Sequence, residues 1–119
     1  MITFEDFQKV EIRIGEILFA EKIPETDKLL KLSVNFGEEM PRSIVSGISV
    51  YFPDEKTLVG KKCAFVTNLE PRTIRGFESN GMILAVSGLK PSADGSSGDQ
   101  SFFSLLETAQ TVLPGSLVK

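Results

Sequence analysis

The sequence predicts an all-β domain of five or more short strands, and two observations carry that prediction. In several runs, apolar residues alternate with polar ones, which is the period of a strand that buries one face. The runs recur roughly every 10–15 residues, separated by turns rich in Gly, Pro and Asp, with no long amphipathic helix between them. In 119 residues this pattern is typical of one small sandwich, or of the five-stranded barrel that binds oligonucleotides and oligosaccharides. Periodicity leaves both folds open.

The N-terminal residues are predicted to form a short helix. Thr3, followed three residues later by Asp6, resembles a capping box, and Phe4 and Phe7 recur at near-helical spacing. We therefore expect a helix of one to three turns at about 3–9.

The first predicted strand runs through "EIRIGEILFAE". Ile12 and Ile14 alternate with charged residues, and after Gly15 the alternation continues out of phase through Ile17 and Phe19. A one-residue phase slip at a glycine predicts a β-bulge there.

Five later segments are predicted to be extended. Residues 29–36 alternate strictly, which places Lys31 on the face opposite the core. The other predicted strands are 42–48, 62–69, 81–86 and 101–107, and residues 113–118 are interpreted as a closing turn with a terminal extended piece. Residues 49–61 are interpreted as a connector with room for a helical turn. Residues 88–100, rich in Gly, Ser, Pro and Asp, are interpreted as a mobile loop.

The composition excludes several kinds of chemistry. With no histidine and one cysteine, the chain lacks a Ser-His-Asp or Cys-His apparatus, a Cys/His zinc site and an intrachain disulfide. Cys63 stands among apolar neighbours and is interpreted as a small buried side chain. No stretch reaches the ~18 apolar residues of a membrane helix, and the N-terminus lacks a signal-peptide pattern. We expect a cytoplasmic protein with no cofactor and no membrane partner.

Positive charge is concentrated in one part of an acidic chain. The net charge of −3 argues against indiscriminate binding of polyanions, yet residues 61–90 carry five basic and two acidic side chains. Within them, Arg72 and Arg75 flank a turn predicted between Pro71 and Gly76, which exposes both guanidinium groups. Each can bind a phosphate through two hydrogen bonds. The alternative is that both are solvated loop charges.

Five segments in consistent order resemble the tRNA-binding domain family: "DFQKVEIRIGEI" (6–17), "DKLLKLSVNFGEE" (27–39), "IVSGI" (44–48), "LVGKK" (58–62) and "NLEPRTIRGFESNGMILA" (68–85). The family includes the C-terminal domain of bacterial methionyl-tRNA synthetase, stand-alone tRNA-binding proteins and a secretion-chaperone branch. The resemblance implies a five-stranded oligonucleotide/oligosaccharide-binding barrel with a short N-terminal helix and a C-terminal extension used for homodimerisation. Met1, close before the first motif, favours a free-standing single domain over 1–119.

The same resemblance implies a set of RNA-binding residues: Lys28, Lys31, Arg42, Asn68, Arg72, Arg75, Ser79 and Met82. The last two occupy the family's Ser-x-x-Met motif, in which a hydroxyl can bond a phosphate or 2′-hydroxyl and a thioether can lie against a base. Alternatively, Ser79 satisfies a turn and Met82 starts a buried strand. For Asn68 the alternative is a hydrogen bond to a turn, and for the lysines it is a solvated charge. Glu70 and Thr73 stand where relatives often carry lysine, which predicts modest affinity for tRNA.

Three aromatic residues could offer faces on which unpaired bases stack, and core packing is the alternative for each. They are Phe36, Phe52 and Phe77, and the last is the best candidate because it lies in the basic segment.

The resemblance favours a non-catalytic tRNA-binding module that recognises tRNA shape and backbone. It would act alone or with an aminoacyl-tRNA synthetase, the methionyl type above others. The alternative is a dimeric chaperone-like protein that binds extended export-precursor peptides. An enzyme fares worst, because the chain has no glycine-rich phosphate loop and no carboxylate pair at a spacing that indicates a shared site.

Overall fold

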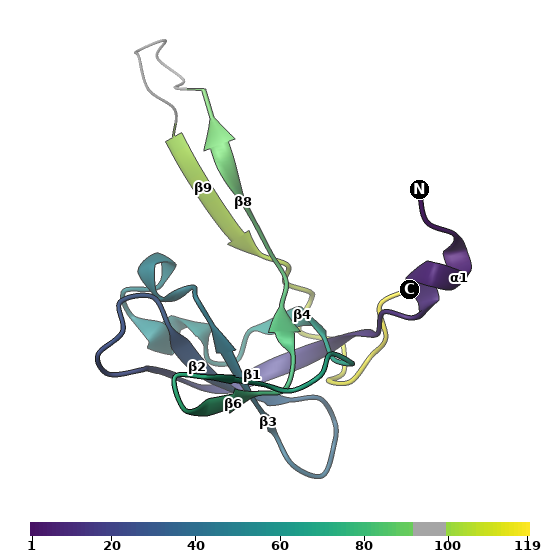
Figure 1. Cartoon of the computed structure of the whole chain (residues 1–119), viewed down its shortest axis with the longest axis horizontal. Helices are drawn as coiled ribbons and strands as arrows, with labels where there is room; N and C mark the ends of the chain where they lie inside the picture. The colour runs from purple at the N-terminus through teal and green to yellow at the C-terminus, as the bar shows by residue number, and fades with distance from the viewer. Residues whose placement is uncertain (92–99) are drawn as a thin grey trace.

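The computed structural model describes residues 1–91 and 100–119 and contains one short helix among many strands (Figure 1). The elements are α1 (Phe4–Gln8), β1 (Ile12–Lys22), β2 (Leu30–Asn35), β3 (Arg42–Ser46), the 3-10 turns η1 (Ser49–Tyr51) and η2 (Glu55–Leu58), β4 (Lys62–Val66), β5 (Arg72–Ile74), β6 (Phe77–Ser79), β7 (Met82–Ile83), β8 (Ala85–Lys90) and β9 (Gln100–Leu105). The predicted all-β class is confirmed, as are the helical turns of the connector 49–61. In the described residues, no helix is long and apolar enough to cross a membrane.

Five strands form a nearly closed antiparallel barrel. Their order is β3-β2-β1-β4-β7. The segment around β6 and β7 reaches β3 from the other end of the sheet: the Asn80 amide donates to the Ser43 carbonyl at 2.8 Å. The five-stranded barrel implied by the family resemblance is therefore confirmed, and the sandwich alternative is excluded.

The alternating residues of β2 fill the barrel, as the sequence pattern predicts. Leu30, Leu32 and Val34 are completely buried, and Phe36 meets Phe65 edge to face with ring centroids 5.2 Å apart. Cys63 is buried in the same core, and desolvation raises the pKa of its thiol to about 11.

The predicted bulge at Gly15 is wrong, because the irregularity of β1 lies three residues later. Ile17 pairs with Val34 and Phe19 pairs with Ser33, so one extra residue of β1 stands between the two pairs. The extra residue turns Phe19 to the outer face, where it is 56% exposed. The glycine at 15 has a packing reason instead: a Cβ there would lie 2.5 Å from Val34 Cγ1.

Strands β8 and β9 form a hairpin that stands away from the barrel (Figure 1). The hairpin is anchored at its base, where the Phe103 ring stacks on Tyr51 at 3.9 Å and meets Phe52 edge to face. The mobile loop predicted for 88–100 is wrong for residues 88–90 and 100, which are paired strand, and its residues 92–99 lie outside the described residues.

The two ends of the chain lie together beside β1 (Figure 1). The capping box is confirmed: the Asp6 amide donates to Thr3 Oγ1 at 3.1 Å and the Thr3 amide donates to Asp6 Oδ2 at 3.3 Å. The C-terminal residues run back along β1, where the Val118 amide donates to the Ile12 carbonyl at 2.9 Å. None of the residues of α1 is buried, so this short helix is held without a covered apolar face.

Candidate nucleic-acid interface

The basic segment forms a small hairpin, β5–β6, closed by a two-residue turn. Ile74 pairs with Phe77, and the turn residues Arg75 and Gly76 have φ of 52° and 83°. Positive φ at both positions is the requirement of a type I′ turn, which suits the twist of a tight hairpin. The turn is therefore shorter than the predicted Pro71–Gly76 turn. Arg72 lies in β5, and both arginines are exposed.

The hairpin packs against the edge strand β3, and its Phe77 ring reaches Lys31 of β2. Buried Ser79 Oγ accepts a hydrogen bond from the Val45 amide at 2.9 Å and donates to the Gly81 carbonyl at 3.3 Å. One strand away, Lys31 Nζ lies 5.0 Å from the centre of the Phe77 ring. The Ser79 hydroxyl is thus used within the chain and holds the basic hairpin against the barrel.

Arg42 ties together three parts of the chain at the open edge of the barrel. Its Nε and Nη2 donate to the two carboxylate oxygens of Glu38, each at 2.8 Å, and its Nη1 donates to the Thr67 carbonyl at 2.7 Å. A second carbonyl, that of Asn80, lies 3.3 Å from Nη1. The hydrogen bonds from Arg42 hold the pKa of Glu38 below its usual value.

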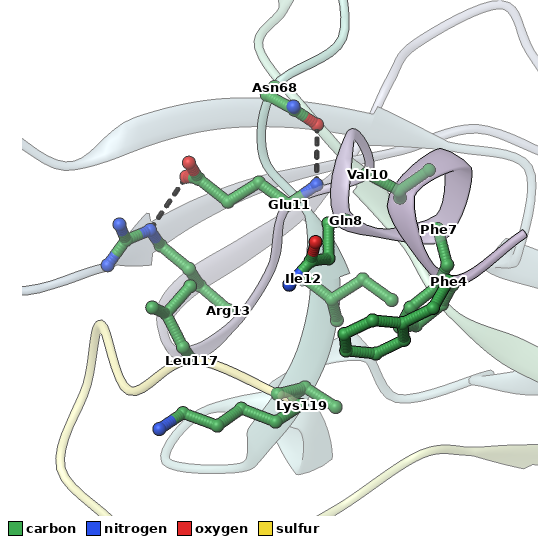
Figure 2. A pocket seen from close by; sticks show the side chains of 11 residues that line it. Phe4, Phe7, Gln8, Val10, Glu11, Ile12, Arg13, Asn68, Leu117 and Lys119 are labelled. Carbon is green, nitrogen blue, oxygen red and sulfur yellow. Dashed lines mark hydrogen bonds and ion pairs between the residues drawn. The ribbon is translucent and has the colours of Figure 1, made fainter.

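Asn68 connects the end of β4 to the start of β1 (Figure 2). Its Oδ1 accepts from the Glu11 amide at 2.9 Å, and its Nδ2 donates to the Lys9 carbonyl at 2.7 Å. Both polar groups of the amide therefore have partners in the protein. Beside it, the carboxylate of Glu11 accepts from Arg13, which lowers the pKa of that glutamate.

The remaining predicted residues present free surface around the hairpin. Lys28 lies exposed in the loop before β2 and lines one shallow cavity with Arg75. Lys31 is half-buried on the outer face, 3.9 Å from Glu21, which confirms the predicted side of β2. Met82 begins β7, in which Ile83 is buried, but its own side chain is 47% exposed.

The predicted site residues thus fall into two groups: those with side chains exposed on the surface and those with side chains hydrogen-bonded within the chain. Side chains available on the surface are Lys28, Lys31, Arg72, Arg75 and Met82, and side chains engaged within the chain are Arg42, Asn68 and Ser79. Lys28 lines a cavity with Arg75, and Lys31 lies over the Phe77 ring while paired with Glu21, so these cations gather around the β5–β6 hairpin.

The three aromatic residues that were predicted as possible stacking faces differ in their burial. Phe36 is buried in the core, so the prediction of a stacking face there is wrong. Phe52 is half-buried and packs against the core, and Phe77 is half-buried beside Lys31. The sequence analysis did not identify Phe19 as an exposed aromatic residue. Its exposure depends on where the bulge in β1 lies, and no signal in the sequence reveals the position of the bulge.

The comparison with protein families decides between the possible readings of this barrel. The family model described as "Putative tRNA binding domain" matches residues 12–116. The chain belongs to the tRNA-binding domain family. This confirms the resemblance found in the five sequence motifs.

Two kinds of relatives resemble this tRNA-binding domain. The methionine–tRNA ligase of Methanoregula boonei is 48% identical over 120 residues, covering 100% of this chain and 16% of the ligase. The curated relatives are thus much longer than this chain, and the tRNA-binding domain is a non-catalytic appendage in them. The solved structure of a MetRS-related protein from Pyrococcus horikoshii superposes with a TM-score of 0.80 at 36% identity, covering 100% of this chain and 98% of that one.

A chaperone shares the fold as well. The structure of the chaperone CsaA from Bacillus anthracis superposes with a TM-score of 0.77 at 26% identity, covering 100% of this tRNA-binding domain and 99% of that chain. The structural relatives of this domain thus include both a MetRS-related protein and a chaperone.

Proposed function

We propose that this domain binds folded tRNA through backbone and ribose contacts and catalyses no reaction. The observation that carries the proposal is the placement of Arg72 and Arg75 on an exposed hairpin, in a chain of the tRNA-binding domain family. Two guanidinium groups on one small hairpin can each bind a phosphate in a two-pronged manner. Recognition of shape suits double-stranded RNA, since its major groove is too narrow for side chains to read.

In this proposal the predicted RNA-binding residues have two roles. The exposed residues contact the RNA directly: Lys28, Lys31, Arg72 and Arg75 through charge, and Met82 through an apolar contact to a ribose or base. Arg42, Asn68 and Ser79 hold the elements that carry those residues. An RNA contact by the second group stays a prediction, which would require RNA to share or replace their hydrogen bonds in the chain.

Neighbouring acidic side chains limit the expected affinity. Glu25 and Asp27 line the same shallow cavity as Lys28 and Arg75, and Glu70 lies in the segment before β5. Repulsion between these carboxylates and phosphates offsets part of the attraction by the basic residues. We therefore expect binding that weakens steeply as salt rises.

An electrophoretic shift over a salt series tests the proposal. Total tRNA is compared with an unstructured RNA of equal length, both titrated with the same protein. A clear preference for tRNA supports recognition of shape, and equal binding of both RNAs indicates general electrostatics. Absence of a shift with both RNAs at low salt would refute the proposal.

The synthetase relatives suggest where the domain acts. We infer that it works either alone or together with a methionyl-type aminoacyl-tRNA synthetase in the cytoplasm, supported by its 48% identity to part of such a ligase. Co-purification of the synthetase with this chain tests the partnership directly.

We also infer a homodimer formed through the paired chain ends. A cavity of about 560 Å³ lies between α1 and the C-terminal residues, and Figure 2 shows the apolar side chains of Phe4, Phe7, Val10 and Leu117 around it. Phe4 is 72% exposed and Leu117 is 53% exposed. Covering such side chains contributes roughly 25 cal/mol per Å² of apolar surface, which favours a second copy on this face.

A peptide-binding chaperone is the second candidate function. The superposition on a chaperone, together with exposed apolar side chains on the β8–β9 hairpin such as Val86 and Leu89, favours it. Micromolar binding of unfolded precursor peptides, with no binding of tRNA at low salt, would establish this function over the first.

A further inference from the structure

The outer face of the barrel carries a further cavity. Of the predicted RNA-binding residues, Lys31 alone lines it. The volume of the cavity is about 400 Å³, within the range of small-ligand sites. Side chains from three adjacent strands and from the loop before β3 line it: Phe19, Glu21, Lys31, Ser33, Met40 and Ser43. The lining combines an aromatic ring, a flexible thioether, a cation and acceptor oxygens.

A straight row across three strands forms the floor of this cavity. Phe19 of β1 pairs with Ser33 of β2, which in turn pairs with Ser43 of β3. The row exists because the bulge in β1 moves Phe19 to the outer face and into register with the two serines. The phenyl ring is 56% exposed, and Met40 nearby is 73% exposed.

One hydroxyl at the floor lacks a partner. Ser43 Oγ is covered from solvent and makes no hydrogen bond with the described residues. A covered hydroxyl without a partner destabilises the fold, because its hydrogen bonds to water are lost and not replaced. A ligand that brings a donor or acceptor edge to the floor would offset part of that destabilisation, after a small shift of the side chains above it.

The cavity adjoins the proposed tRNA-binding hairpin. Lys31 is the link, since it lines the cavity, lies 3.9 Å from Glu21 and sits over the Phe77 ring of the hairpin. A phosphate held by Lys31 would therefore have its nucleoside within reach of Phe19. The cation of Lys31 beside the ring of Phe19 is complementary to a nucleotide, because a nucleotide has a negatively charged phosphate and a flat base.

We propose that this cavity holds one unpaired base of the bound RNA, stacked on the Phe19 ring with its edge toward Ser43. The inference rests on the proposed tRNA function and adds a contact that reads a nucleobase instead of the backbone. A base stacked on an aromatic ring contributes to affinity whatever its identity, so the site favours an unpaired position over a particular sequence.

Filter binding of total tRNA tests the site with three variants. Phe19→Ala removes the ring and should weaken binding by about 5- to 150-fold, while Phe19→Tyr keeps the ring and should bind like the original chain. Leu18→Ala is the matched control, since Leu18 is 43% exposed but does not line the cavity. The salt slope should be the same in all variants, because no phosphate contact is removed.

A mononucleotide separates failure of this inference from failure of the tRNA function. Adenosine 5′-monophosphate should shift the nuclear magnetic resonance signals of the Phe19 ring and the Ser43 amide, and ribose 5-phosphate should not. If the original chain binds tRNA and Phe19→Ala binds it equally well, the base site is refuted and the tRNA function stands. If tRNA does not bind, the function fails, and the absence of mononucleotide shifts then refutes the base site as well. A third outcome is that Phe19→Ala binds an unfolded carboxymethylated polypeptide more weakly than the original chain does but binds tRNA equally well. That result would refute the base site and would indicate a peptide site instead.

Discussion

Arg42 and Glu38 form a two-pronged ion pair at the edge where the barrel closes, with both N–H···O distances at 2.8 Å. The same guanidinium donates to the carbonyl of Thr67, a buried residue at the end of β4. One side chain therefore links the loop before β3 to the opposite strand. The arrangement makes Arg42 a candidate for stability as well as for the RNA contact that the family resemblance implies.

Removing this guanidinium should destabilise the barrel. Arg42→Met leaves the Thr67 and Asn80 carbonyls without their donor, so we expect the free energy of unfolding to fall by about 1–3 kcal/mol in a urea titration. Lys56→Met, at an exposed side chain of η2, should change it by less than about 0.5 kcal/mol. Equal stability of the two variants would show that the Arg42 bonds add nothing.

The Glu38 carboxylate should make stability depend on pH. Its pKa in the folded chain is lowered from 4.5 by the hydrogen bonds from Arg42, so the folded state binds the proton less readily than the unfolded state. The contribution is therefore present above about pH 4.5 and is lost as pH falls through the lower folded pKa. Glu38→Gln should be less stable than the original chain at pH 7, by less than about 1 kcal/mol since the pair is partly exposed, and the difference should shrink as pH falls below 4.5. A stability gap that persists unchanged in acid would contradict this assignment.

The hydroxyl of Ser79 should contribute to the stability of the fold and not to direct binding of RNA. Ser79→Ala leaves the buried amide of Val45 without an acceptor, which should cost about 1–3 kcal/mol in chemical unfolding. Ser104→Ala is the control, because among the described residues that hydroxyl bonds only the carbonyl of the next residue, on an exposed strand. Loss of tRNA affinity in Ser79→Ala with no change in stability would instead identify a direct RNA contact.

Packing at Gly15 should tolerate no side chain. A Cβ would lie 2.5 Å from Val34 Cγ1 and 2.6 Å from Phe36 Cε1, both buried in the core. Gly15→Ala should therefore lower the thermal midpoint, with a cost of about 1–3 kcal/mol from overpacking. Gly47→Ala should leave the midpoint nearly unchanged, because among the described residues no atom beyond the two chain neighbours lies within 4 Å of the added carbon.

The hairpin arginines should control tRNA affinity and its dependence on salt. Arg72→Gln combined with Arg75→Asn removes two charges, and asparagine tolerates the positive φ of position 75. We expect weaker tRNA binding and a shallower plot of log affinity against log salt, by roughly 1.4–1.8 units for two phosphate contacts. Lys56→Gln with Lys90→Gln removes two exposed charges elsewhere and serves as the control. An unchanged slope in the arginine variant would remove both residues from the site.

The proposed dimer should depend on the apolar surface at the chain ends. Phe4→Glu with Leu117→Glu places charge on that surface, and the mass from light scattering should fall from twice 13.0 kDa to 13.0 kDa. Val59→Glu, at a comparably exposed apolar residue away from this cavity, should keep the larger mass. A single copy in the unaltered protein would contradict the proposal outright.

Local patterns in the sequence predicted much of this fold. The alternation of Leu30, Leu32 and Val34 is a backbone period, and the Thr3 cap acts over three residues, so neither needs knowledge of the rest of the chain. The five motifs between residues 6 and 85 likewise identified the family. The bulge was placed wrongly, because the position of the extra residue depends on how β1 and β2 register against each other.

The sequence by itself therefore determined the strand periods, the capped helix, the family and the absence of histidine chemistry. Only the tertiary structure decided which basic and polar residues are free to meet a ligand. Arg42, Asn68 and Ser79 find their partners 25, 57 and 34 residues away, across the closing barrel. Phe19 reaches the outer face through one extra residue in β1. The physical reason is that hydrogen-bond partners and strand register are set by long-range pairing, whereas periodicity and capping act between near neighbours in the chain.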